Sequence, residues 1–96
     1  MMGKSVTVEL IGAARIVAGR KEIPLTLREG ASWRDAVTAL AREAPVLVGE
    51  VIAKDGHSLL GDYTFSLGGR TFVRALDAEV QPPESGRVTL MDFSDV

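Results

Sequence analysis

The sequence has no cysteine, which excludes disulfide bonds, thiolate nucleophiles and cysteine-based metal sites. Its 96 residues include a single histidine, His57, in a loop of glycine and serine. A lone histidine lacks the companion ligands that a metal site needs, so we expect His57 to be solvent-exposed and predict no metal or cofactor. Without cysteine or a motif of paired carboxylates there is little catalytic chemistry to assign, and the sequence argues against an enzyme.

Strong charge and long apolar runs are also missing. The formal net charge is only -2, which gives no electrostatic reason to bind nucleic acid or an anionic membrane. No run approaches the roughly 18 apolar residues of a membrane span, and Met1–Ser5 lead into the first strand without a signal-peptide segment. With 46% hydrophobic residues, the chain is predicted to form one domain over residues 1–96 and to be cytoplasmic.

Two stretches near the start have the alternation of half-buried strands. Val6–Leu10 places its apolar residues on one face, so that Ile11 would point to the opposite, otherwise polar face. Glu22–Leu27 resumes the alternation, and residues 12–21 between them are predicted to be a loop. Pro24 removes one backbone donor, which places the second strand at a sheet edge.

One amphipathic helix is predicted from Trp33 to Ala44. Ser32 followed by Asp35 has the spacing of a capping box, and Pro45 ends the helix. A second short helical segment is predicted over residues 47–52, although Gly49 weakens it. The apolar stripe of the main helix consists of Trp33, Ala36, Val37, Leu40, Ala41 and Ala44.

The last third of the chain is predicted to form strands. Tyr63–Leu67 and Arg70–Val73 flank Gly68-Gly69, a pair typical of a tight hairpin turn. The final strand is predicted over Arg87–Met91, after the loop signals Pro82-Pro83 and Ser85-Gly86. The alternative for Gly68-Gly69 is a processing site that exposes a diglycine, but cleavage there would remove this final strand. Strands grouped around one helix predict an α+β domain, with a mixed sheet covered by that helix on one face.

Several segments together resemble one family. Leu10-Ile11-Gly12-Ala13-Ala14-Arg15, Leu27-Arg28-Glu29-Gly30-Ala31-Ser32, the Gly68-Gly69 hairpin and Gly86-Arg87-Val88-Thr89-Leu90 are similar to the molybdopterin synthase small subunit and the related sulfur carrier of thiamine synthesis, the MoaD/ThiS-like proteins. The resemblance covers nearly the whole chain. It implies a ubiquitin-like β-grasp fold of about five strands and one main helix, in which the first and last strands are adjacent and parallel.

The same resemblance implies a chemistry that the tail does not match. Members of this family are adenylated at a C-terminal Gly-Gly by an E1-like enzyme and carry sulfur there as a thiocarboxylate. Here Asp95 and Val96 stand at the end, and no glycine follows Gly86. The hypothesis is a noncovalent interaction subunit or regulator in a sulfur-transfer or molybdenum-cofactor context. The alternative is an active sulfur carrier, through tolerance of this tail or a different C-terminus in the cell.

A partner surface follows from the resemblance and the alternation together. If the first and last strands pair, Ile11 and Met91 become outward neighbours, and Phe93, Asp95 and Val96 extend the surface along the tail. The resemblance implies as partner an E1-like adenylating enzyme or a molybdopterin-synthase-like large subunit. The alternative is that Ile11 and Met91 are ordinary surface residues or are buried under the tail.

A cluster of positive charge is a further candidate. Arg15, Arg20 and Lys21 fall in the predicted loop after the first strand. They either meet an acidic patch of a partner or form a solvated turn.

Overall fold

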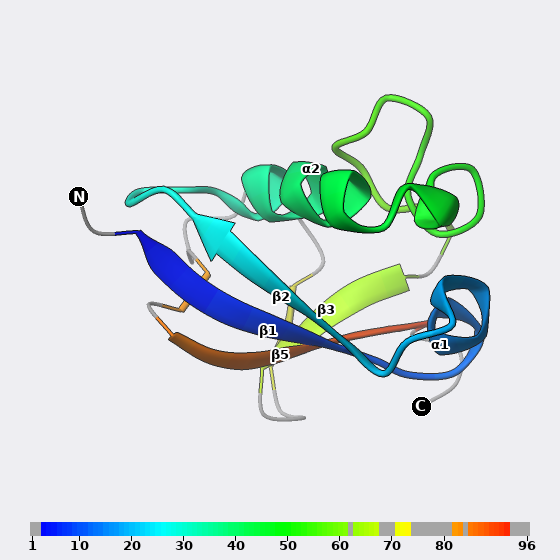
Figure 1. The fold of residues 1–96 in the computed structure, drawn as a ribbon, viewed down its shortest axis with the longest axis horizontal. Helices are drawn as coiled ribbons and strands as arrows, with labels where there is room; N and C mark the ends of the chain where they lie inside the picture. Colours follow the sequence, from blue (N-terminus) through cyan, green and yellow to red (C-terminus); the bar gives the residue numbers. More distant parts are fainter. Residues whose placement is uncertain (1–2, 62, 68–70, 74–81, 84, 93–96) are drawn as a thin grey trace.

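The computed structural model describes residues 3–61, 63–67, 71–73, 82–83 and 85–92. Within them the chain forms a five-stranded sheet and one principal helix, which lies across one face of the sheet (Figure 1). The strands are β1 (Lys4–Leu10), β2 (Glu22–Leu27), β3 (Tyr63–Leu67), β4 (Thr71–Val73) and β5 (Ser85–Asp92). The helical segments are α1 (Ala13–Ala18), α2 (Trp33–Glu43) and the single 3-10 turn η1 (Pro45–Leu47).

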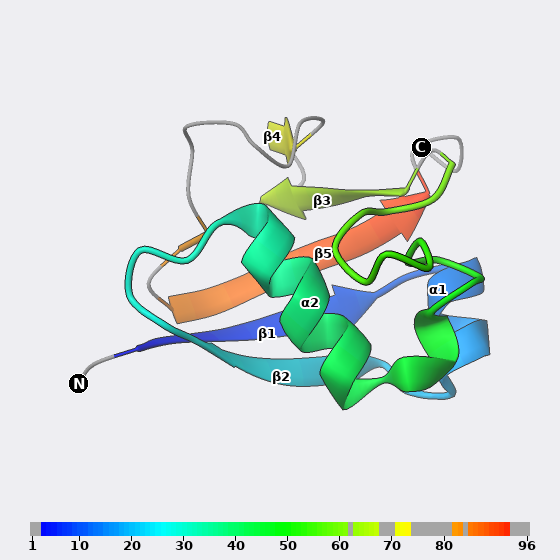
Figure 2. The same cartoon turned by 90° about the horizontal axis from the view of Figure 1, so that it is seen from above.

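The strand order is β2-β1-β5-β3-β4. β1 and β5 run parallel, with Val8 opposite Val88 and Leu10 opposite Leu90, and every other pair is antiparallel. Figure 2 shows α2 crossing over the strands obliquely. The predicted α+β architecture, with adjacent and parallel first and last strands, is confirmed.

β2 occupies an edge of the sheet, as Pro24 predicts. The amide of Leu10 donates to the carbonyl of Lys21 over 2.8 Å, which makes this an exchanging pair of the antiparallel ladder. Counting from that pair, Ile23, Leu25 and Leu27 bond β1, whereas the backbone groups of Pro24 face the free edge. The missing donor of proline therefore costs no hydrogen bond of the ladder. It also leaves the free edge with one donor fewer for pairing with a strand of another molecule.

The core lies between the sheet and α2. Trp33 is 1% exposed, and its ring stacks on that of Phe65 with centroids 4.9 Å apart. The predicted capping box is present: the Asp35 amide donates to Ser32 Oγ (3.1 Å), and the Ser32 amide donates to Asp35 Oδ2 (2.9 Å). The other fully buried large side chains of the core are Val8, Leu10, Ile23, Val37, Leu40, Leu47, Val51, Ile52 and Leu90.

The segment after β1 is not wholly a loop, so that prediction is wrong. Residues 13–18 form α1, which follows Gly12 and ends at Gly19, a left-handed glycine whose amide donates to the Arg15 carbonyl over 2.9 Å. A helix this short is marginal in water by itself. Its stability comes from tertiary packing, since Ala14 is completely buried.

The second helix predicted over residues 47–52 is also wrong, apart from the turn η1. Gly49 adopts a positive φ of 94°, and its amide donates to the Ile52 carbonyl over 2.7 Å. This turn lets Val51 and Ile52 point into the core, and Ile52 forms an isolated bridge with Leu59. The apolar run therefore reflects burial in an irregular segment and not a helical face.

The C-terminal strands follow the predictions closely. Leu67 opposes Thr71 in an antiparallel pair, which confirms the hairpin, while Gly68-Gly69 lie outside the described residues. β5 begins earlier than predicted, because Ser85 and Gly86 belong to the strand and not to the preceding loop. Gly86 keeps the extended pairing with Val6 at a φ of 105°, a conformation that side chains rarely adopt.

Replacing Trp33 by alanine should lower the free energy of unfolding by about 3 to 5 kcal/mol, because the ring leaves a cavity against Phe65. Ile16→Ala, at an 82% exposed residue of α1, is the matched control and should change it by less than about 0.5 kcal/mol. Urea denaturation followed by circular dichroism measures both. Equal losses would show that Trp33 does not anchor the core.

The capping box gives a pH-dependent prediction. The pKa of Asp35 lies below its usual 3.8. The hydrogen bond from the Ser32 amide has the largest effect, and the Arg28 guanidinium and the Ser32 hydroxyl lower the pKa further. The carboxylate therefore stabilises the fold above pH 3.8, and this contribution is lost as the pH falls through the lowered folded-state pKa. Asp35→Asn should cost about 0.5 kcal/mol at neutral pH, and the gap from wild type should close in acid. Glu43→Gln, at the other end of α2, is the charge-matched control, and a pH-independent gap would contradict the prediction.

Candidate docking face

The central strands present one face to the core and one to the outside. Val6, Val8 and Leu10 of β1 are buried under α2, so their neighbours Thr7 and Glu9 point to the other side. In the described part of the chain no helix covers this second face (Figure 1). We call it the open face.

An ion pair occupies the middle of the open face. The Arg87 guanidinium of β5 donates to the Glu22 carboxylate of β2, reaching across β1. This hydrogen bond, together with the charges of Glu22 and Glu9, raises the pKa of Arg87 above its usual value. Since both side chains of the ion pair are partly exposed, this part of the face is polar and the pair adds little to stability.

On the β3 side of the open face, the outward side chains are buried and not accessible. Thr64 and Ser66 alternate with the core residue Phe65, yet both are buried. Thr64 Oγ1 donates to the Val73 carbonyl of β4 over 2.7 Å, which satisfies its hydroxyl. The accessible part of the open face therefore lies over β2, β1 and β5.

Ile11 and Met91 lie at one end of the open face. Ile11 follows the last residue of β1, and its amide still donates to the Leu90 carbonyl of β5 over 3.2 Å. Because Leu10 opposes Leu90, Ile11 and Met91 are the next residues along the parallel pair. Ile11 is 42% exposed and Met91 is half-buried, so the structure brings an apolar pair to this end of the sheet. The other predicted members, Phe93, Asp95 and Val96, lie outside the described residues.

His57 lies in an exposed loop, as predicted. The Asp55 carboxylate accepts hydrogen bonds from the amides of His57 (2.9 Å) and Ser58 (3.0 Å) and from the Ser58 hydroxyl (2.9 Å). These bonds, with the His57 amide first, lower the pKa of Asp55. Arg34 of α2 also donates from Nη1 to Ser58 Oγ over 3.1 Å, so the loop is tied to α2. Among the described residues, no group of three or more histidine, aspartate or glutamate side chains could hold a metal.

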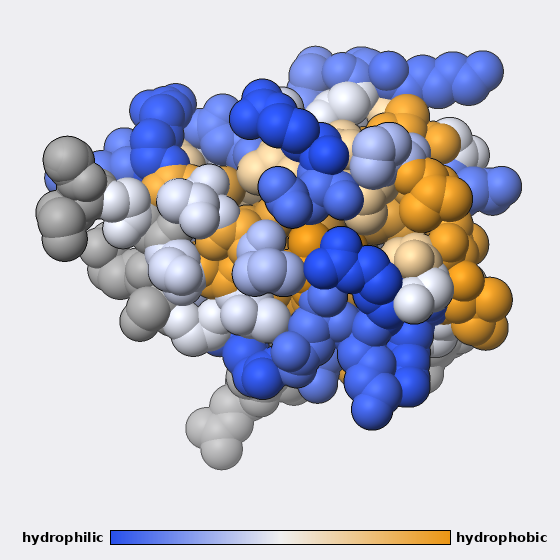
Figure 3. Space-filling model, in the orientation of Figure 1, coloured by the Kyte–Doolittle hydropathy of each residue, from blue (hydrophilic) through white to orange (hydrophobic). Residues whose placement is uncertain are grey.

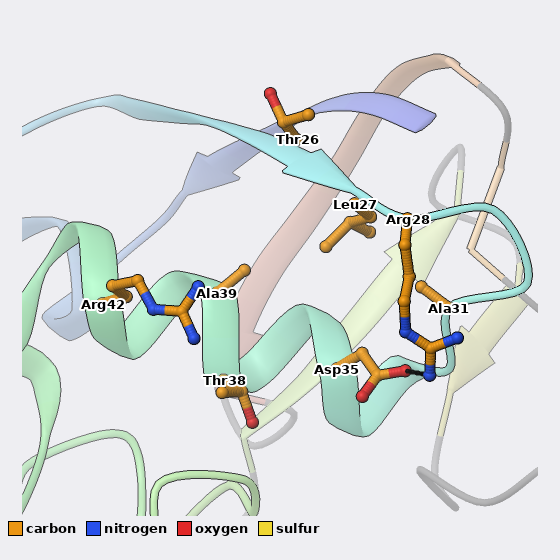
Figure 4. Close-up of a pocket in the computed structure, with 8 residues that line it drawn as sticks. All are labelled: Thr26, Leu27, Arg28, Ala31, Asp35, Thr38, Ala39 and Arg42. Carbon is orange, nitrogen blue, oxygen red and sulfur yellow. Dashed lines mark hydrogen bonds and ion pairs between the residues drawn. The ribbon is translucent and has the colours of Figure 1, made fainter. Parts of the chain in front are cut away.

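A shallow groove separates α2 from the end of β2 (Figure 4). Arg28 Nη2 pairs with Asp35 Oδ2 over 3.0 Å at one end, and Arg42 lies toward the other. The remaining lining residues, Thr26, Leu27, Ala31, Thr38 and Ala39, include no nucleophile paired with a base. The groove therefore offers no catalytic constellation.

Sequence reasoning missed the most exposed of the large apolar residues. Ile16 of α1 is 82% exposed and lines a hollow with Arg15, Gly19, Arg20 and Lys21. Figure 3 shows apolar surface at the end of the molecule where Figure 1 places α1 and η1. The available signal was the run Ala13–Ala18 between two glycines, which could have been recognised as a helix turning Ile16 outward.

Comparison with known proteins agrees with this architecture. No family model matches the chain, and no curated protein matches it by sequence. Solved structures do match, among them SAMP1 from Haloferax volcanii, with a TM-score of 0.74 and 23% identity over 92% of this chain and 93% of that one. The chain has the ubiquitin-like β-grasp fold.

Two further structures extend this likeness. The small archaeal modifier protein 1 of Methanosarcina acetivorans has a TM-score of 0.70 and 22% identity over 94% of this chain and 93% of that one. A Pyrococcus furiosus protein described as molybdopterin converting factor subunit 1 has a TM-score of 0.65 and 25% identity over 91% of this chain and 94% of that one. The predicted resemblance to MoaD/ThiS-like proteins is therefore confirmed at the level of the fold. Within the part of the chain that the structure describes, none of the helices has the length and apolar character of a membrane span.

Replacing Ile11 by aspartate tests whether this end of the open face is surface or core. Since Ile11 lies beyond β1 and is partly exposed, the free energy of unfolding should change by less than about 0.5 kcal/mol. Leu10→Asp, at the buried neighbour, is the control and should prevent folding. Comparable damage from both variants in thermal denaturation would place Ile11 in the core.

Proposed function

We propose that this chain is a ubiquitin-like docking protein of the molybdopterin synthase small subunit and sulfur-carrier type, which acts in the cytoplasm by binding a protein partner and not as an enzyme. The observation that carries the proposal is the apolar pair Ile11 and Met91 at the end of the parallel strands, in a fold shared with small modifier proteins. Its partner is an E1-like adenylating enzyme or a molybdopterin-synthase-like large subunit.

The energetics of such a contact favour a small apolar centre. Exposed apolar side chains release water when a partner covers them, and a few central residues carry most of the affinity of an interface. The Arg87–Glu22 ion pair beside them is already satisfied within the chain. It therefore contributes to register and specificity more than to affinity.

For a chain whose mature end is Asp95-Val96, we propose that the contact is noncovalent. A glycine carboxylate enters a narrow active site because glycine has no side chain. The branched side chain of Val96 would crowd such a channel, and the carboxylate of Asp95 would have to lose its water there. Binding in this proposal needs the folded domain, while the terminal carboxylate takes no part in chemistry.

An active sulfur carrier is the second candidate. It is favoured by the descriptions of two structural neighbours, a small archaeal modifier protein and molybdopterin converting factor subunit 1. In this reading the terminus is tolerated or differs in the cell, and the same face docks the adenylating enzyme.

The two candidates differ at the terminal carboxylate, so the experiment compares this chain with a variant carrying Asp95→Gly and Val96→Gly. Each is incubated with ATP, a sulfur donor and an E1-like adenylating enzyme, and intact mass reports replacement of a carboxylate oxygen by sulfur. We expect both chains to bind the enzyme and only the Gly-Gly variant to be converted. A thiocarboxylate on Val96 would establish the second candidate.

Docking itself is tested by Ile11→Asp and Met91→Asp in pull-downs with the adenylating enzyme and with a molybdopterin synthase large subunit. Each variant should weaken binding by roughly tenfold or more. Thr7→Asp, on the same face but away from the apolar pair, is the control and should have little effect. Undiminished binding by folded Ile11→Asp and Met91→Asp variants would refute the proposed face.

A further inference from the structure

A second surface lies at the end of the molecule formed by α1. It consists of Arg15, Ile16, Arg20 and Lys21, which line one hollow together with Gly19. We call it the α1 surface. We infer that the α1 surface binds a short acidic segment of another protein that carries an apolar side chain.

The first observation is the exposure of Ile16. At 82% it is the most exposed of the large apolar residues in the described part of the chain, although it lies on a helix whose other side is buried at Ala14. Among the described residues, none buries its side chain. The turn η1, which contacts α1, also carries an exposed apolar residue, Val46.

The second observation is uncompensated positive charge. Arg15, Arg20 and Lys21 are exposed, and no acidic side chain of the described residues pairs with any of them. The acidic residue next in the chain, Glu22, pairs instead with Arg87 on the open face. Cations near the C-terminal end of a helix do stabilise it, but that effect gives no reason for the exposure of Ile16.

The two observations together select the occupant. Carboxylates of a partner would pair with the cations, and an apolar side chain would cover Ile16 and lose its water. A nucleic acid backbone would satisfy the charges only, and the net charge of -2 opposes a long polyanion over the rest of the surface. A short acidic peptide with an apolar anchor fits both features.

The α1 surface is separate from the pair Ile11 and Met91, and the inference does not depend on the proposed function. α1 contacts β5, so the two surfaces adjoin at the same end of the sheet. A partner on the open face could therefore place an acidic segment against α1. Variants of the α1 surface leave Ile11 and Met91 unchanged, so the two ideas can fail independently.

The probe is a fluorescent synthetic peptide with aspartates around a central leucine. Two companion peptides replace the aspartates by asparagine or the leucine by serine, and a single-stranded oligothymidine is the anionic control. Fluorescence anisotropy should show binding of the first peptide that weakens as salt rises. Each companion peptide should bind roughly tenfold more weakly, because it lacks either the carboxylates or the apolar side chain.

Two double variants separate the effect of the α1 surface on binding from the effect of the net charge of the protein. Arg20→Glu with Lys21→Glu should weaken the peptide roughly tenfold or more, and Ile16→Ser several-fold without loss of thermal stability. The control variant, Arg42→Glu with Lys54→Glu, makes the same change in charge at exposed residues outside the hollow. It should weaken binding of the peptide far less. Circular dichroism checks the fold of each.

Three results would overturn the inference. They are no binding of the acidic apolar peptide, equal weakening by both double variants, or tighter binding of the oligothymidine than of the peptide. The last would assign the cations to nucleic acid.

Discussion

The parallel pairing of β1 with β5 is the constraint on which the rest of the structure depends. A parallel pair cannot be closed by a tight turn, so the chain between the two strands has to cross over the sheet, and α2 is part of that crossover. β2 and β3 then pair outward from this centre, and β4 extends the sheet beyond β3. The stack of Trp33 on Phe65 fastens the start of α2 to β3, so one helix holds both halves of the sheet.

The same pairing sets where the two proposed docking surfaces lie. Because β1 and β5 run in one direction, both strands finish at the same end of the sheet. Ile11 leads directly into α1 at this end, and Met91 lies beside it. The apolar pair of the open face and the basic hollow of α1 therefore adjoin, although Met91 comes from the last strand and the other residues lie between positions 11 and 21.

The residues that stabilise the fold are not the residues proposed for recognition. The buried side chains of the sheet and α2 supply the apolar area that stabilises the fold, whereas Ile11, Ile16 and the cations around it are exposed and contribute little to folding. Exposed residues of this kind can change without loss of the domain. A ubiquitin-like fold can accordingly keep its architecture while its surfaces and tail suit different partners, and function has to be argued from those sites.

The sequence by itself determined what depends on neighbouring residues. Alternation defined β1 and β2, Pro24 placed β2 at the edge, and Ser32 with Asp35 set the start of α2, because each signal acts within a few residues. Only the tertiary structure decided the helical state of Ala13–Ala18, which needs the burial of Ala14, and the irregular path of Val51 and Ile52 into the core. It also decided that Ile16 is exposed beside cations that pair with no acidic side chain of the described residues. The parallel register that joins Ile11 to Met91 could be expected only from the resemblance, since pairing between distant strands depends on the packing of the whole chain.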